Sequence, residues 1–420
     1  MHRLLLLLLL AHLVPAAEGN PMLASLRDLV IPDATITRLE RQESDTLELA
    51  NEAPRRGLPP RTVVRLELRP AQGSRIVVEV WLPDPERWNG RFLGLGNGGA
   101  AGHINPGALA DACRGGHAVA HTDMGTFPDS SSGNGNPEVW RDFGHRATHL
   151  MTTAGKALVR AAYGRDPSFS YFVGGSTGGQ QAMQEAQRHP DDYDGIVARV
   201  PAHCRAPLHA YFLWNHQILA RRPFTPAQQQ AVVAAANEHM APREIAATAG
   251  RMVSDPRATP ADIAAVIALA RQRDPSLTDA HAEALRKLFD GPRHALTGER
   301  IFDGVPLGSS WDNATGNLYL FHWVFGPRQN LLQLDFAADI ERYLAALGPD
   351  LNAEDDDLSR FRARGGRLLV VSGTADACVP YHATLDWYER LCERAGSPQA
   401  AAEFCRFYLV PGMGHGADGP

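Results

Sequence analysis

The residues of this chain best suited to chemistry are Ser176 and the glycines around it. They lie in Tyr171-Phe-Val-Gly-Gly-Ser-Thr-Gly-Gly179, where the apolar run Phe169 to Val173 ends in the pattern Gly-x-Ser-x-Gly. This pattern is typical of a serine on a sharp turn between a strand and a helix, because glycines admit strained backbone angles and close approach of neighbouring segments. Residues Gln180 to Arg188 fit the helix, which Pro190 would end. The pattern indicates a nucleophilic serine.

Two later segments offer the partners that such a serine needs, a histidine to accept its proton and an acid to orient the histidine. In α/β-hydrolases the order along the chain is serine, acid, histidine. The run Arg367-Leu-Leu-Val-Val-Ser-Gly-Thr-Ala-Asp376 predicts a strand followed by Asp376, and the predicted strand Phe404 to Val410 leads into Pro411-Gly-Met-Gly-His415. Open α/β sheets place their sites just beyond strand ends. We therefore predict a triad of Ser176, Asp376 and His415.

The segments that must position these side chains fall into distinct patterns. Residues 25 to about 203 alternate predicted strands with helices, which indicates an α/β sheet entered through an antiparallel hairpin. From about 204 to 340 the strand pattern nearly vanishes and helical stretches predominate, and the α/β pattern resumes at about 341. The predicted strands include Thr62 to Leu68, Ile76 to Leu82, Arg91 to Leu95, Ala118 to Thr122 and Gly195 to Arg199; the predicted helices include His145 to Tyr163, Pro226 to Met240, Pro260 to Arg271, Asp279 to Phe289 and Leu331 to Leu347.

Several short blocks of sequence follow one another in a recognisable order. They are Trp88-Asn-Gly-Arg-Phe-Leu-Gly-Leu-Gly-Asn-Gly-Gly99, His121-Thr-Asp-Met-Gly125, Asp142-Phe-Gly-His-Arg-Ala147, Gly174-Gly-Ser-Thr-Gly-Gly179, His189-Pro-Asp-Asp-Tyr-Asp-Gly195, Gly373-Thr-Ala-Asp376 and Val410-Pro-Gly-Met-Gly-His415. In this order they resemble the tannase/feruloyl esterase family, which includes mono(2-hydroxyethyl)terephthalate hydrolase. The resemblance implies an α/β-hydrolase core at 20–203 and 341–420, a large, mainly helical inserted lid at 204–340, and hydrolysis of esters of aromatic acids.

The resemblance also implies a role for each site residue. Ser176 would be the nucleophile, Asp376 the orienting acid and His415 the general base. The oxyanion hole would use the backbone N–H of Thr177 and that of Gly99. This assignment is physically reasonable, because the glycine loop 96–99 follows a predicted strand and lets amides converge on a developing negative charge.

Two departures from the family pattern concern its crosslink and its metal. Family members usually carry cysteines where this chain has Gly175 and Gly416, bonded to each other. Without that bridge we expect His415 to be held by packing and Asp376 alone, in a looser loop. The family lid often holds calcium, but the matching stretch 246–257 keeps only Asp255 among few oxygen side chains, whereas calcium takes about six to eight oxygen ligands. We predict no structural calcium, no other metal and no cofactor.

The aromatic residues of the predicted lid are candidates for the substrate-binding wall. Trp311, Trp323 and Phe325 could stack on a phenolic acyl group. The alternative is that they form the lid's own core, since large aromatic side chains are more often buried for packing.

Composition agrees with an exported globular enzyme. The chain has 420 residues and a net charge of −6, with no basic block that would suggest nucleic acid or an anionic membrane. Residues 1–19 resemble a signal peptide, with Arg3 before the apolar run Leu4 to Leu10, which is too short to span a bilayer. A secreted or periplasmic protein is expected. The chain has five cysteines, and we select Cys392 and Cys405 as the candidate disulfide pair. The other three are Cys113, Cys204 and Cys378.

The sequence therefore predicts a secreted serine carboxylic-ester hydrolase that acts on a small ester, aromatic in its acid part. Two alternatives stay open. The same triad could serve a non-phenolic ester, a lactone or an amide, because fold does not fix the acyl group. The chain could instead be a non-catalytic binding protein on a hydrolase scaffold. The ester itself and the oligomeric state are not indicated.

Overall fold

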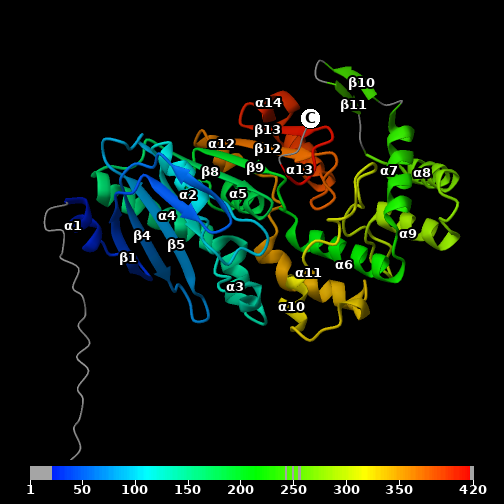
Figure 1. Cartoon of the computed structure of the whole chain (residues 1–420), viewed down its shortest axis with the longest axis horizontal. Coiled ribbons are helices and arrows are strands. Elements are labelled where there is room, and N and C mark those ends of the chain that lie inside the picture. Colours follow the sequence, from blue (N-terminus) through cyan, green and yellow to red (C-terminus); the bar gives the residue numbers. More distant parts are fainter. Residues whose placement is uncertain (1–20, 242–243, 248–249, 254–256, 417–420) are drawn as a thin grey trace, which may run out of the picture.

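A nine-stranded sheet forms the centre of the molecule (Figure 1). The computed structural model describes residues 21–241, 244–247, 250–253 and 257–416, with the side chains of Pro21 and 242–256 left out. The predicted leader lies outside these residues. In spatial order the strands are β1 (Ala34–Gln42), β4 (Arg61–Leu68), β5 (Ile76–Pro83), β7 (Ala118–Thr122), β6 (Arg91–Leu95), β8 (Phe169–Gly175), β9 (Gly195–Arg199), β12 (Arg367–Gly373) and β13 (Cys405–Val410).

The direction of the strands decides where the site can lie. Strands β1, β4, β5 and β7 pair antiparallel, and the predicted entry hairpin is the β4–β5 pair, with Leu68 opposite Ile76. From β7 to β13 every pairing is parallel. Parallel strands bring their carboxyl ends to one edge of a sheet. The chain segments that follow β8, β12 and β13, which carry the predicted triad, therefore leave the sheet at the same edge.

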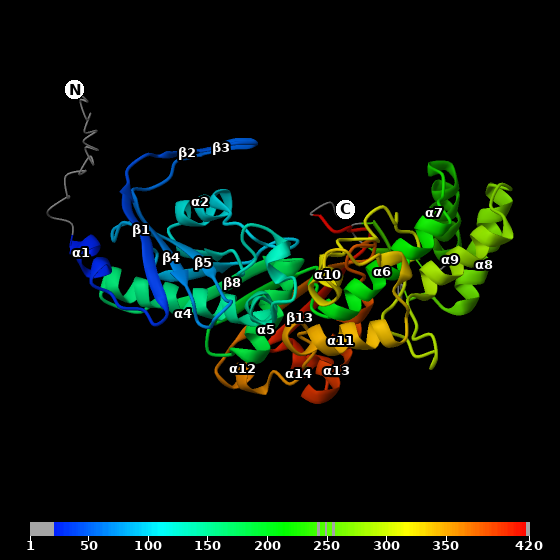
Figure 2. The ribbon, with the colours of Figure 1, turned by 90° about the horizontal axis from the view of Figure 1, so that it is seen from below.

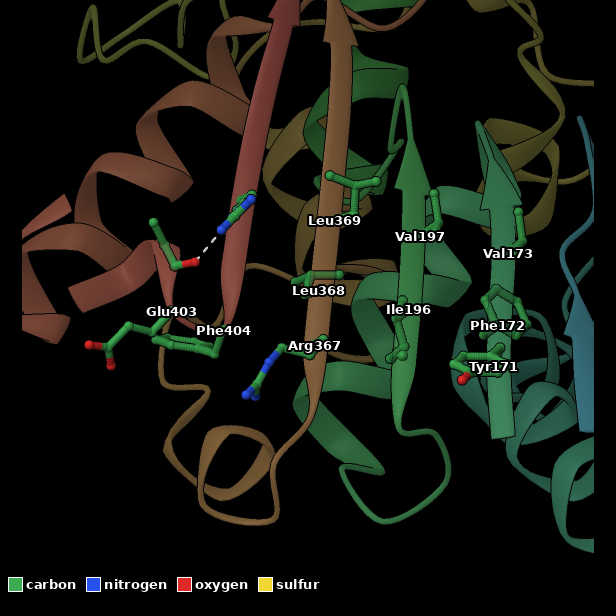
Figure 3. A pocket seen from close by; sticks show the side chains of 13 residues that line it. Tyr171, Phe172, Val173, Ile196, Val197, Arg367, Leu368, Leu369, Glu403 and Phe404 are labelled. Atoms are coloured by element: carbon green, nitrogen blue, oxygen red, sulfur yellow. Dashed lines mark hydrogen bonds between the residues drawn. The ribbon is translucent and has the colours of Figure 1, made fainter. Parts of the chain in front are cut away.

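Helices cover the two faces of the sheet unequally (Figure 2). On one face α4 (Ala147–Tyr163) and α5 (Thr177–Arg188) pack directly against the strands, around fully buried side chains such as Phe172 and Val370. Residues of α11 (Ala338–Leu351) and α13 (His382–Ala395) belong to the same core. The opposite face carries α2 (Pro106–Arg114) over β5 and β7. Farther along that face, β8, β9 and β12 line a groove of about 440 Å³ (Figure 3). Its walls include Tyr171, Val197 and Leu369.

The long segment between β9 and β12 is mainly helical, as predicted. Its described part adds no strand to the central sheet, and it contains the hairpin β10 (Glu244–Ala247) and β11 (Gly250–Val253). The helices of this segment are α6 (Arg205–Arg221), α7 (Pro226–Met240), α8 (Pro260–Arg273), α9 (Asp279–Asp290), α10 (Tyr319–Phe325), α11 and α12 (Ser359–Ala363). Helices α7, α8 and α9 gather at one end of the molecule (Figure 1) around their own core, which includes Val232, Val266 and Leu285.

The remaining elements are short and lie at the margins of the sheet. No described helix combines the length and the apolar character that crossing a bilayer requires. A π-helical turn at Asp142–Arg146 leads into α4. The other elements are α1 (Pro21–Arg27), the hairpin of β2 (Thr46–Leu49) and β3 (Glu52–Arg56), α3 (Pro137–Arg141) and α14 (Pro398–Ala402).

Two predicted features differ in the structure. The helix predicted from Leu331 starts at Ala338, because the Asp335 carboxylate accepts hydrogen bonds from the amides of Ala337 and Asp339 and sets a turn there. The predicted Cys392–Cys405 bridge is not formed, and all five cysteines are free thiols. Burial raises the pKa of both thiols, which disfavours the thiolate that disulfide chemistry needs.

Three glycines let the loop after β6 touch the turn after β8. A Cβ added at Gly96 would lie 2.5 Å from the Cα of Gly178 and 2.9 Å from that of Gly174. We predict that Gly96→Ala lowers the free energy of unfolding by about 1–3 kcal/mol or more, because two backbones must separate. Urea denaturation measures this change. Gly98→Ala is the matched control, since a Cβ there meets nothing within 4 Å; equal losses in the two variants would contradict the prediction.

Candidate active site

Ser176 lies on a strained turn between β8 and α5. Its backbone has φ 58° and ψ −117°, a left-handed region that non-glycine residues rarely adopt. Hydrogen bonds fix this conformation: the Ser176 amide donates to the carbonyl of Arg199 at 3.0 Å, and the Gly178 amide donates to the carbonyl of Asn97 at 2.7 Å. Strain held by surrounding contacts is a common feature of functional positions. The turn presents the Ser176 hydroxyl at the carboxyl edge of the sheet.

The structure brings Asp376 and His415 together with Ser176. His415 Nδ1 lies 2.9 Å from Asp376 Oδ2, and His415 Nε2 lies 3.0 Å from Ser176 Oγ. The Asp376 side chain is fully buried, and its Oδ1 accepts hydrogen bonds from the amides of Cys378 at 2.9 Å and Val379 at 2.8 Å. With Nδ1 donating to the carboxylate, the lone pair of Nε2 faces the serine hydroxyl. This geometry suits proton transfer from Ser176 to His415.

The electrostatic surroundings favour the charged form of His415. Burial lowers the pKa of His415, but the hydrogen bond to Asp376 and the neighbouring Cys378 thiol outweigh it and raise the pKa above the usual value for histidine. A more basic imidazole holds the proton from the serine more firmly. The amides of Cys378 and Val379, which no sequence pattern indicated, keep the carboxylate in place for this role.

The loop that carries His415 is fastened to the loop that carries Asp376. The Ala375 amide donates to the carbonyl of Met413 at 3.1 Å, and the Gly412 amide donates to the Thr374 hydroxyl at 2.9 Å. The expectation that packing and Asp376 alone hold His415 is therefore wrong, because hydrogen bonds between the two loops also hold it. Whether the loop is looser than in relatives with the disulfide stays a prediction.

The two residues predicted to form the oxyanion hole lie side by side. The Thr177 hydroxyl donates a 2.7 Å hydrogen bond to the carbonyl of Gly99, and Gly99 has a left-handed φ of 57°. Among the described residues, neither the Thr177 amide nor the Gly99 amide is bonded to another protein group. Both N–H groups are thus available as hydrogen-bond donors, and their role in an oxyanion hole stays a prediction. Sequence reasoning missed the bond made by the threonine hydroxyl.

The predicted substrate-wall residues lie largely in cores. Trp311 is 4% exposed and packs on Phe224 in the core of the insertion. Trp323 is 1% exposed, and its indole N–H donates to the carbonyl of Ser130. Phe325 is half-buried. Among the described residues, no hydrogen bond or ring contact joins these three side chains to the triad, and their role as a wall stays a prediction.

One group of described residues could hold a metal ion. Donor atoms of His149, His189 and Asp192 lie within 4.8 Å of one another. However, His149 Nδ1 and Asp192 Oδ2 already share a 2.7 Å hydrogen bond, and the rings of His149 and His189 stack on each other. The group lies at the end of α5 opposite to Ser176, so it takes no part in the site. The stretch 246–257, predicted to bind no calcium, lies almost wholly outside the described side chains.

The order and direction of the strands, with the serine turn at their carboxyl edge, define an α/β-hydrolase fold. The family model "Tannase and feruloyl esterase" matches residues 62–328 and 324–420. An uncharacterized esterase of Xanthomonas campestris is 30% identical in an alignment of 453 positions, which covers 97% of this chain and 78% of that protein. Feruloyl esterase B of Aspergillus niger is 30% identical in an alignment of 371 positions, which covers 85% of this chain and 71% of that protein.

Solved structures agree with the sequence comparison. The crystal structure of feruloyl esterase B from Aspergillus oryzae has a TM-score of 0.81 and 25% identity, and covers 95% of this chain and 84% of that one. Tannin acyl hydrolase from Aspergillus niger, at 18% identity, shares the fold with a TM-score of 0.70 over 94% of this chain and 82% of that one. The chain belongs to the tannase and feruloyl esterase family and is a carboxylic ester hydrolase.

The contact with Cys378 allows a test of the basicity of His415. A general base works only when neutral, so kcat/KM should fall as the pH decreases through its pKa. Because Cys378 raises that pKa, Cys378→Ala should move the acid limb to lower pH, by roughly one pH unit. A pH profile of kcat/KM measures the shift. Cys392→Ala, on α13, is the control, and an unmoved limb in Cys378→Ala would contradict the prediction.

Proposed function

We propose that this protein hydrolyses esters through an acyl-serine intermediate on Ser176. The observation that carries the proposal is the continuous hydrogen-bond chain from Ser176 Oγ through His415 to Asp376, at 3.0 and 2.9 Å. The two free amides beside Ser176 support it further. A non-catalytic binding protein would not need a strained serine within hydrogen-bond distance of a buried imidazole–carboxylate pair.

The proposed reaction has two halves. His415 Nε2 takes the proton of Ser176 as its oxygen attacks the ester carbonyl, and the amides of Thr177 and Gly99 donate to the resulting oxyanion. The intermediate collapses, His415 gives the proton to the leaving alkoxide, and an alcohol departs. Water then attacks the acyl-Ser176 ester with His415 again as the base, which releases the acid. Asp376 stabilises the imidazolium in both halves.

We propose an ester of an aromatic, phenolic acid as the substrate. The support is membership of the family and the similarity to feruloyl esterase B of Aspergillus niger. The burial of Trp311 and Trp323 favours a packing role for these rings, which leaves Phe325 as the sequence-predicted wall residue with part of its ring exposed. An aliphatic ester remains the second candidate, because the triad does not select the acyl group.

Replacement of the nucleophile tests the mechanism. Ser176→Ala should lower kcat by about 10⁴- to 10⁶-fold, because proton transfer and covalent catalysis are lost together. Turnover of methyl ferulate, methyl gallate, a terephthalate monoester and 4-nitrophenyl acetate measures the loss and ranks the acyl groups. A fluorophosphonate should label the wild-type protein and Ser359→Ala, an exposed control at the start of α12, but not Ser176→Ala. Intact turnover in Ser176→Ala would contradict the mechanism.

We also propose that the protein is exported. The support is the single basic residue Arg3 followed by the apolar run Leu4 to Leu10 and a small-residue segment. The mature protein, isolated from periplasm or culture medium, should begin near residue 20 when its N-terminus is sequenced. Recovery of the full-length chain from the cytoplasm alone would refute export.

A further inference from the structure

Arg205 joins the two residues that are proposed to form the oxyanion hole. It is the first residue of α6 and is 4% exposed. Its Nη1 donates to the Thr177 hydroxyl at 3.0 Å, and its Nη2 donates to the carbonyl of Gly99 at 3.1 Å. Nη2 also donates to the Tyr319 hydroxyl at 2.7 Å. With the Thr177–Gly99 bond, these contacts form one closed network.

The network holds the end of the glycine loop, beyond Asn97, whose carbonyl and amide are already bonded to α5. A Cβ added at Gly98 or Gly99 would meet no atom within 4 Å, so the loop borders open space. The carbonyl of Gly99 accepts from both Arg205 and Thr177. Two donors on one oxygen fix the orientation of the peptide that bears it. The Gly99 amide lies in the preceding peptide unit, which shares the Gly99 Cα, so the network restrains the amide through that atom.

The charge of Arg205 is not balanced by a carboxylate among the described residues. Its hydrogen-bond partners are a hydroxyl, a carbonyl and a phenol, and its guanidinium carbon lies 5.4 Å from the ring centre of Phe143. It also stands at the positive end of the α6 dipole, which makes a cation less favourable. Burial and the charge of Arg205 lower the pKa of His209, so that ring stays neutral beside it.

A buried cation without a counter-charge is costly to the folded state. That cost is offset when a negative charge forms close by. In the reaction proposed above, such a charge forms on the ester oxygen that the Thr177 and Gly99 amides receive. The guanidinium is bonded to both of these residues and is almost fully buried, so we expect it to act through them and not by contact with the substrate.

We infer that Arg205 is a positioning residue that aligns the Thr177 and Gly99 amides and adds its positive charge to the field at the oxyanion. The inference rests on the proposed function, since it concerns the same site. It also gives the insertion a role in catalysis itself, because Arg205 and Tyr319 both belong to the segment between β9 and β12. The consequence is specific: loss of Arg205 should slow the chemical step more than it weakens substrate binding.

Steady-state kinetics with 4-nitrophenyl acetate and methyl ferulate test the inference. Arg205→Gln should lower kcat by about 10- to 100-fold, less than the 10²–10³ that loss of a donor itself costs, and leave KM within about threefold. Arg205→Lys should lower kcat by a smaller factor, because lysine keeps the positive charge. Some loss is still expected, because an ammonium group cannot reach all three partners of the guanidinium. Arg221→Gln, at the far end of α6, is the matched control and should keep wild-type kinetics. Fluorophosphonate titration counts the folded sites in each sample.

The outcomes separate this inference from the proposed function. Unchanged kcat per titrated site in Arg205→Gln, or a rise in KM alone, overturns the inference even when Ser176→Ala is inactive. Full activity of Ser176→Ala overturns the proposed function itself. If Arg205→Gln does not fold, Thr177→Val decides, since it removes the hydroxyl of the network and keeps the amide. About a tenfold loss of kcat is expected there, and unchanged kcat overturns the inference.

Discussion

The buried carboxylate of Asp376 is the group on which the rest of the site depends. A fully buried negative charge is unfavourable unless every lone pair finds a donor. The amides of Cys378 and Val379 and the His415 ring together supply three donors. Their geometry fixes the loop after β12, and this loop in turn holds the loop after β13 through the Met413 carbonyl. One desolvated carboxylate thus contributes both to the basicity and to the position of His415.

A second constraint is the close approach of backbones around the serine turn. Gly96, Gly174 and Gly178 leave no room for side chains between β6, β8 and α5. This contact places the glycine loop beside Ser176, and Arg205 then links that loop to the first helix of the insertion. Core and insertion are therefore connected at the proposed oxyanion hole, where a displacement of an amide by about 1 Å would slow the reaction strongly.

The sequence predicted the features that depend on local patterns. The serine turn, the strands before Asp376 and His415, and helices such as α7 have clear periodicity and turn residues, and the structure contains them. Helix α6 was not predicted, because it is buried on most sides and lacks an amphipathic period. Arg205 could not be recognised either, since its role depends on Gly99 and Tyr319, which lie 106 and 114 residues away. The core positions of Trp311 and Trp323 depend on tertiary packing, which the composition of the segment does not reveal.

The sequence separation within the triad has a consequence for biosynthesis. Ser176 and His415 are 239 residues apart. Strand β12 pairs with β9 and β13 pairs with β12, so both strands join the sheet only after the whole insertion has been made. A nascent chain can thus form β8 and its turn before the ribosome has added His415. Such non-local closure is slow compared with the formation of helices. The esterase would become catalytically active only in the last stage of folding, and partly synthesised chains would have no esterase activity.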